Sequence, residues 1–139
     1  MIRTGVAVAS AAILLGGCGN GGVPNADPTP TAPVQAAPGF AVVVTENDRA
    51  VTVSTGQKIE LVLRARSGMT EWSGVDVDNP SVLRAVPTGI LAAKGVTIAG
   101  FVAIAPGTAT IRATAGPLCS PNQACPQYAA LFEVTVTVT

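Results

Sequence analysis

Apolar side chains recur at every second position along most of the chain from Phe40 to the C-terminus, with Thr, Ser, Arg or Glu between them. Successive side chains of a β-strand point to opposite faces, so this period predicts strands with one face turned to a core. We expect eight strands, at residues 41–45, 51–54, 59–64, 73–78, 81–86, 96–105, 109–114 and 132–138. The clearest is 59–64, in which three large aliphatic residues alternate with Glu60, Val62 and Arg64 and predict a half-buried strand.

Turn-forming residues separate these strands at intervals of roughly ten residues, and no segment shows the period of a helix. This spacing predicts an all-β fold, an immunoglobulin-like antiparallel β-sandwich of about seven or eight strands. Trp72 is then expected to be the large core residue of the sandwich, in preference to an exposed binding aromatic. In 96–105 the alternation changes phase, and a β-bulge at Gly100 would turn both apolar sets inward.

The first seventeen residues have the parts of a secretory signal. Arg3 supplies a positive charge, residues 6–15 are apolar but too few to span a bilayer comfortably, and Gly16 and Gly17 precede Cys18. This order resembles the lipobox of bacterial lipoproteins, which implies lipidation of the Cys18 sulfur, cleavage before Cys18, and display on the outer face of the cytoplasmic membrane or cell envelope. Acyl chains anchor a protein because each buried CH₂ contributes about 0.8 kcal/mol. The alternative is an ordinary cleaved signal with a chance cysteine.

Residues 18–38 are rich in proline, glycine and alanine and predict a disordered tether with a polyproline-II tendency. The expected organisation is therefore a signal peptide at 1–17, a lipidated linker at 18–38 and a β-sandwich domain at 39–139.

The charge balance and the composition argue against several classes of function. The chain has 8 basic and 8 acidic residues and no basic run, which argues against a nucleic-acid partner. It has no histidine, the usual acid–base group near neutral pH and the commonest metal ligand. No Gly-x-Ser-x-Gly elbow occurs, and the two lysines have no spacing that favours a Ser–Lys pair. We expect neither an enzyme nor a cofactor.

Cys119 and Cys125 are the sharpest local feature of the domain. In an exported protein two such cysteines most simply form a disulfide, which either rigidifies a recognition loop or merely closes a long loop. A zinc site is disfavoured because a structural site needs four ligands. Asp76 and Asp78 share one strand face and offer oxygen ligands for calcium, but Asp-Asn-Pro is more typical of an Asx turn that ends a strand.

The order of short motifs along residues 50–138 resembles the chagasin-like cysteine-peptidase inhibitors and, less closely, bacterial immunoglobulin-like repeats. The motifs are the Val-x-Val-x-x-Gly-x-x-Ile-x-Leu run at 51–61, Trp72, Asn-Pro-Ser-Val-Leu at 79–83, Pro-Gly-Thr-Ala-Thr-Ile at 106–111 and Phe-x-Val-x-Val at 132–136. The resemblance implies that three loops at one end of the sandwich form the contact surface. In this chain the family's first-loop motif is replaced by residues 66–71, and the third loop keeps only Pro117.

These observations lead to one main hypothesis of function and two alternatives. The main hypothesis is a membrane-anchored, non-catalytic immunoglobulin-like module that binds an unidentified protein or envelope ligand through residues 67–71, 89–95 and 117–126. The alternatives are a chagasin-like cysteine-peptidase inhibitor that uses the same loops and a structural spacer without a specific partner. The residues expected to contact a partner are Gly68, Met69, Thr70, Glu71, Gly95, Pro117, Leu118 and Pro121.

Overall fold

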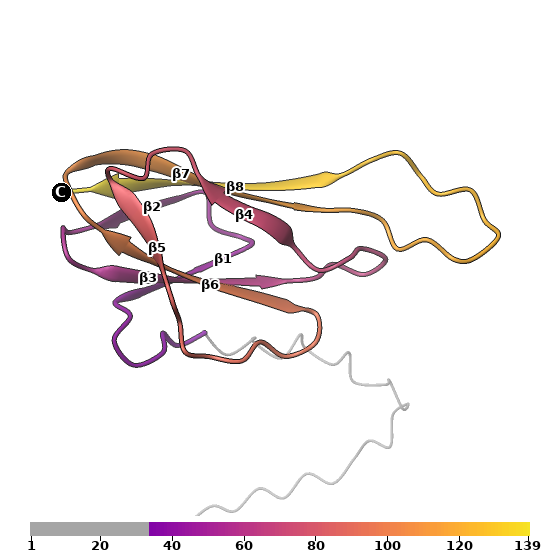
Figure 1. Cartoon of the computed structure of the whole chain (residues 1–139), viewed down its shortest axis with the longest axis horizontal. Helices are drawn as coiled ribbons and strands as arrows, with labels where there is room; N and C mark the ends of the chain where they lie inside the picture. The colour runs from indigo at the N-terminus through magenta and orange to yellow at the C-terminus, as the bar shows by residue number, and fades with distance from the viewer. Residues whose placement is uncertain (1–33) are drawn as a thin grey trace, which may run out of the picture. The chain divides into compact units, whose positions relative to one another are not determined.

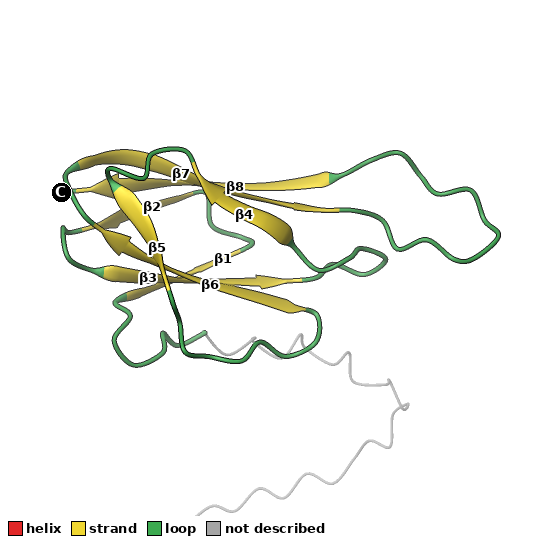
Figure 2. Ribbon diagram, viewed as in Figure 1, coloured by secondary structure: helices red, strands yellow, loops and turns green. Residues whose placement is uncertain are grey.

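The computed structural model describes residues 34–139, so the predicted signal peptide, Cys18 and most of the predicted tether lie outside it. The described residues form eight strands and no helix (Figures 1 and 2). The strands are β1 (Val42–Thr45), β2 (Ala50–Val53), β3 (Lys58–Arg64), β4 (Ser73–Val77), β5 (Leu83–Val86), β6 (Val96–Ala103), β7 (Gly107–Ala115) and β8 (Ala130–Val138). Within residues 34–139 there is accordingly no helix of the length and apolarity that crossing a membrane requires.

The strands form two sheets of four, ordered β1-β3-β6-β5 and β2-β8-β7-β4. The prediction of an all-β sandwich is confirmed. Pairing is antiparallel except at two sheet edges, where β1 pairs with β3 and β2 pairs with β8 in parallel. The chain passes from one sheet to the other between β1 and β2, in a turn where the Asp48 carboxylate accepts hydrogen bonds from the Thr45 amide (2.7 Å) and hydroxyl (2.9 Å).

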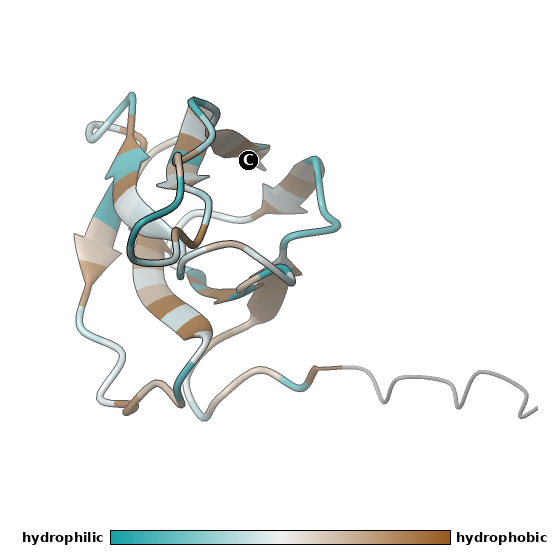
Figure 3. Cartoon of the chain, turned by 90° about the vertical axis from the view of Figure 1, so that its right-hand side faces the viewer, coloured by the Kyte–Doolittle hydropathy of each residue, from teal (hydrophilic) through white to brown (hydrophobic). Residues whose placement is uncertain are grey.

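The core lies between the sheets and is built from the inward residues of the alternating strands, visible as bands along the ribbons in Figure 3. The largest fully buried side chains are Phe132, Ile59, Leu61, Leu63, Leu83, Ile111, Val44, Val134 and Val136. Trp72 is buried, and its ring meets Phe132 edge to face at 6.1 Å between centroids. Its indole N–H donates to the Arg64 carbonyl at 2.9 Å, which satisfies the one polar group of this side chain. The expected core role of Trp72 is confirmed.

The prediction that strand 59–64 is half-buried is wrong, because its outer face is also covered. Glu60 and Val62 are only 4% and 7% exposed. The Ala37 amide donates to the Glu60 carboxylate at 2.7 Å, and the Phe40 ring lies against Gly100 on the outer face of β6. The segment before β1 therefore lies against the outer face of this sheet. Its contact at Ala37 comes just before residue 39, where the sequence predicts that the domain begins.

The predicted bulge at Gly100 is also wrong. β6 keeps one unbroken register with β3 and another with β5, and Gly100 lies opposite Glu60 and Val86. Phe101 and Ala103 point to the core, so Val96 and Ile98 lie on the outer face, where they are partly buried. A glycine is needed here for a different reason: an added Cβ would lie 2.8 Å from the Val86 carbonyl oxygen and 3.1 Å from the Phe40 ring.

Candidate functional site

Three connections meet at one end of the sandwich: the β3–β4 loop (65–72), the β5–β6 loop (87–95) and the β7–β8 loop (116–129). The first and third leave the two sheets at this end, on the right of Figure 1, and the third projects farthest. The second leaves β5 opposite Gly100, runs along β6, and reaches this end with Lys94 and Gly95. We call residues 65–72, 94–95 and 116–129 the loop end.

Backbone hydrogen bonds join the first and third loops. The Thr70 amide donates to the Gly116 carbonyl at 2.8 Å, and the Gly116 amide donates to the Thr70 hydroxyl at 3.0 Å. The Leu118 amide donates to the Gly68 carbonyl at 2.9 Å, and Met69 and Pro117 form an isolated β-bridge. Gly68 has a φ of 76°, a left-handed conformation that a side chain would strain.

The end of the second loop is tied to the first. The Glu71 carboxylate accepts a hydrogen bond from the Gly95 amide, and the Ala65 amide donates to the Gly95 carbonyl at 2.7 Å. Next to this contact, the Thr97 hydroxyl donates to the Trp72 carbonyl at 2.7 Å. The first loop is therefore the centre of the loop end, with hydrogen bonds to both neighbours.

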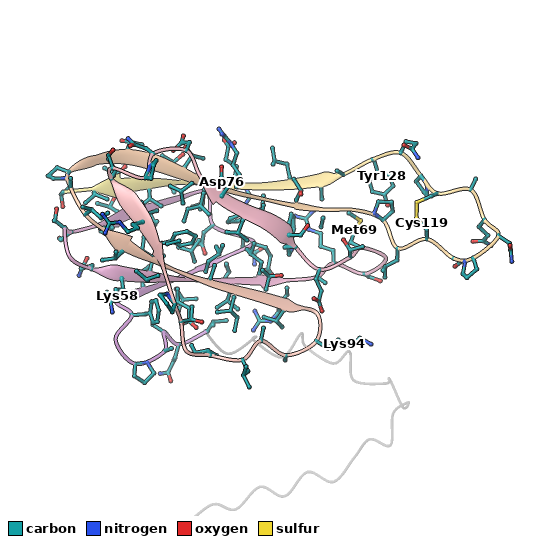
Figure 4. All side chains as sticks on the ribbon, in the orientation of Figure 1. Lys58, Met69, Asp76, Lys94, Cys119 and Tyr128 are labelled. Atoms are coloured by element: carbon teal, nitrogen blue, oxygen red, sulfur yellow. A yellow bond between two sulfur atoms is a disulfide. The ribbon has the colours of Figure 1, made fainter. Side chains whose placement is uncertain are left out.

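A pocket of about 590 Å³ lies where the three loops meet. Its walls include Ala65, Met69 and Leu118, and its polar side carries Glu71 and Lys94. Leu118 is 64% exposed and adds apolar surface to the rim of this pocket. Met69, Lys94 and Cys119 are labelled on the three loops in Figure 4.

The structure brings together seven of the eight predicted contact residues. Pro121 is the exception, because it lies in the exposed tip of the third loop, beside Asn122 with a φ of 66°. Cys119 and Cys125 close this tip with a disulfide whose Cα atoms are 5.4 Å apart, as predicted (Figure 4). The predicted lipidation of Cys18 lies outside the described residues.

Three residues that line the pocket, Ala65, Ser73 and Lys94, were not among the eight predicted contact residues. Leu91 lies in the predicted range 89–95, does not line the pocket and is 96% exposed. Lys94 belonged to the predicted range 89–95, but nothing in its neighbours distinguishes it from any surface lysine.

Comparison with known proteins bears on the fold of this domain. The sequence matches no family model and no curated protein. Among solved structures, it is similar to the cysteine protease inhibitor EhICP2 from Entamoeba histolytica. The identity is 17% and the TM-score 0.51, over 74% of this chain and 100% of that one. The two domains share a fold. A second similar structure, amebosin, has 17% identity and a TM-score of 0.41 over 70% of this chain and 97% of that chain.

The resemblance to cysteine-peptidase inhibitors is thus supported at the level of the fold. In EhICP2 the likeness extends over the whole chain, so the shared part includes the complete sandwich and not one hairpin of it.

The remaining candidate residues have local structural partners. The Asp78 carboxylate accepts a hydrogen bond from the Thr110 amide at 2.7 Å, and the Asn79 side chain donates to the Thr108 carbonyl at 3.3 Å. These contacts tie the end of β4 to β7. The expected turn after this strand is present, but it is closed by the Val82 amide, which donates to the Asn79 carbonyl at 3.1 Å, and not by an Asx side chain. Residues 34–139 bring no three potential metal-ligating side chains together.

Two arginines have different surroundings. Arg66 is exposed, and its guanidinium lies over the Trp72 ring, 5.7 Å from the ring centroid. On the outer face of the second sheet, Arg112 donates to Glu133 at 2.8 Å, and this hydrogen bond raises the pKa of the Arg112 guanidinium. Both side chains of the pair are about half exposed, so the pair is a surface feature and contributes little to a site.

Proposed function

We propose that this domain is a non-catalytic protein-binding module that inhibits cysteine proteases through its loop end. The observation that carries the proposal is the set of hydrogen bonds that unites three loops, distant in sequence, into one surface. A surface ordered before binding loses little conformational entropy when a partner docks, and this favours affinity. The fold shared with a cysteine protease inhibitor supports the choice of partner.

The loop sequences suggest how such a surface binds. The first loop reads Arg-Ser-Gly-Met-Thr-Glu at 66–71 and lacks the motif of the chagasin-like inhibitors, as noted above. Binding would therefore depend on the joint shape of the loops and on exposed apolar groups such as Leu118 and Tyr128. Apolar and aromatic side chains near the centre of an interface usually dominate its energetics.

An inhibition assay tests the proposal. The chain from Gly19 to Thr139 is titrated against papain with a fluorogenic substrate, and we expect inhibition at micromolar concentration or below. Leu118→Asp should weaken inhibition by about tenfold or more, because hot-spot residues contribute at least about 2 kcal/mol. Thr108→Asp, on the exposed face of β7 away from the loop end, is the matched control and should inhibit like the parent. Absence of inhibition at micromolar concentration would overturn the choice of partner.

The predicted signal and lipobox favour a second candidate, a module that binds an envelope protein while anchored through lipid on Cys18. We propose the anchor on the sequence alone. Cys18→Ala should move the protein from the membrane to the soluble fraction, and unchanged partition into detergent would contradict lipidation. A pull-down from native envelope that depends on Leu118, with papain not inhibited, would favour the envelope partner.

A further inference from the structure

The pocket at the loop end is formed in the free protein. Its walls come from three loops that are fixed to one another through Gly68, Gly95 and Gly116 by the hydrogen bonds described above. Its volume of about 590 Å³ lies within the range of pockets that hold small ligands, so more than one apolar side chain fits inside it. The pocket can therefore accept a side chain of the partner, whereas the projecting loops would insert into the partner.

The lining indicates an apolar occupant. Ala65, Met69 and Leu118 present aliphatic and thioether surface, and Leu118 remains 64% exposed. Covering this surface removes apolar area from water, which stabilises a complex by about 25 cal/mol per Å² before the costs of association.

The pocket wall carries one charge of each sign, Glu71 and Lys94. The Glu71 carboxylate accepts a hydrogen bond from the Gly95 amide, which fixes its position, and Arg66 lies over Trp72. The third loop, 116–129, contains no charged residue. Within residues 34–139 the Lys94 ammonium forms no ion pair, although it lies on the wall of the pocket. A carboxylate beside the apolar group would complement this charge.

We propose that the pocket binds a peptide segment of the partner protein in which apolar side chains are followed by a carboxylate that pairs with Lys94. This inference rests on the proposed function and names the chemistry of the partner at that surface. A peptide suits the site because the pocket is open to solvent, so a side chain can enter it while the main chain stays outside.

Peptide titrations test the proposal directly. The probe is a capped tetrapeptide of one alanine, two leucines and an aspartate, added to the ¹⁵N-labelled chain from Gly19 to Thr139. We expect saturable amide shifts at Gly95 and Leu118. Replacing the aspartate by asparagine should weaken binding by about 2- to 5-fold, as for an exposed ion pair. Raising the salt concentration to about 1 M should remove this difference, because the Debye length falls to about 3 Å.

Charge reversal supplies the matched variants. Lys94→Glu should reverse the preference, so that a tetrapeptide ending in lysine binds more tightly than the one ending in aspartate. Lys58→Glu makes the same change at the only other lysine, at the start of β3 near the opposite end of the sandwich (Figure 4), and should leave the preference unchanged. Both lysines are exposed, so neither variant endangers the fold.

Three results would overturn the proposal: no shifts at Gly95 and Leu118, equal binding of the aspartate and asparagine peptides, or tighter binding of octanoate than of the peptide. The last result would make the occupant a free amphiphile. Papain inhibition is measured on the same variants. Inhibition without peptide binding overturns the pocket assignment and leaves the proposed function intact. Peptide binding without inhibition overturns the proposed function and leaves the pocket assignment intact.

Discussion

The two sheets of the sandwich have outer faces of opposite character, although the strands of both alternate with period two. On the β1-β3-β6-β5 sheet the outward residues Glu60 and Val62 are 4% and 7% exposed, and Gly100 is buried. On the β2-β8-β7-β4 sheet the outward Arg112 and Glu133 are about half exposed, and Leu131 is 60% exposed. The middle of the first sheet, around Glu60, Val62 and Gly100, is covered on both sides, whereas the outer face of the second sheet is exposed to water at Leu131, Arg112 and Glu133.

The alternation of apolar and polar residues therefore predicts which side chains of a strand face the core. It does not predict whether the opposite face of the sheet is exposed to water. The first sheet is covered by the segment before β1, through Ala37 and Phe40, which is outside every strand. A glutamate on each sheet shows the consequence. Glu60 accepts a backbone hydrogen bond in a buried site, whereas Glu133 forms a solvated ion pair.

The largest expected effect comes from adding a methyl group to the covered face. Gly100→Ala places a Cβ 2.8 Å from the Val86 carbonyl oxygen, a backbone atom of the paired strand that has no rotamer to change. We expect a loss of about 3 kcal/mol in the free energy of unfolding, at the upper end of the usual cost of overpacking. Urea denaturation monitored by tryptophan fluorescence measures it, because Trp72 is the one tryptophan in the chain.

The control for this substitution is Gly116→Ala. A Cβ at Gly116 meets no atom within 4 Å. The free energy of unfolding of the Gly116→Ala variant should therefore remain close to that of the parent. Equal losses in the two variants would show that the close approach of Gly100 to Val86 and Phe40 does not exist in solution.

The sequence predicted the inner half of each sheet well. Residues such as Ile59, Leu61 and Val134 follow the period, and the edge-on contact of Trp72 with Phe132 closes the core that this period implies. The disulfide was also predicted, because the sequence predicts export and two cysteines in an exported chain most simply pair with each other. These features depend on short-range pattern or on cysteine chemistry.

The outer cover was not predictable in the same way. Glu60 reads as a solvent-facing residue, and only contact with Ala37, 23 residues away, buries it. The phase change near Gly100 was read as a bulge because both apolar sets were assumed to point to one core. The structure gives Val96 and Ile98 a second, outer environment instead. The resemblance predicted that three loops meet at one end of the sandwich, and Leu118 was among the predicted contact residues. The pocket between these loops was not predicted, because Ala65 and Lys94 carry no sequence feature that marks them as its walls.

A smaller effect is expected from removing the buried carboxylate. Glu60→Ala leaves the Ala37 amide without its acceptor in a covered site, which costs about 2 kcal/mol for a hydrogen bond to a charged group. Glu133→Ala on the open sheet removes only a solvated partner of Arg112, so we expect little or no change. Urea denaturation of the Glu60→Ala and Glu133→Ala variants measures this difference in the free energy of unfolding. Similar losses in both variants would contradict the difference between the two outer faces.

The smallest effect tests whether the cover acts as one unit. Phe40 is half-buried beside Gly100, and Phe40→Ala should cost about 1 kcal/mol, less than for a fully buried ring because the cavity can open to water. Leu131→Ala on the open sheet should cost less still. If residues 37–40 leave the sheet together, the double variant with Glu60→Ala loses less stability than the sum of the single losses, since either change already releases the segment. Strict additivity in the double-mutant cycle would mean that Ala37 and Phe40 bind the sheet independently.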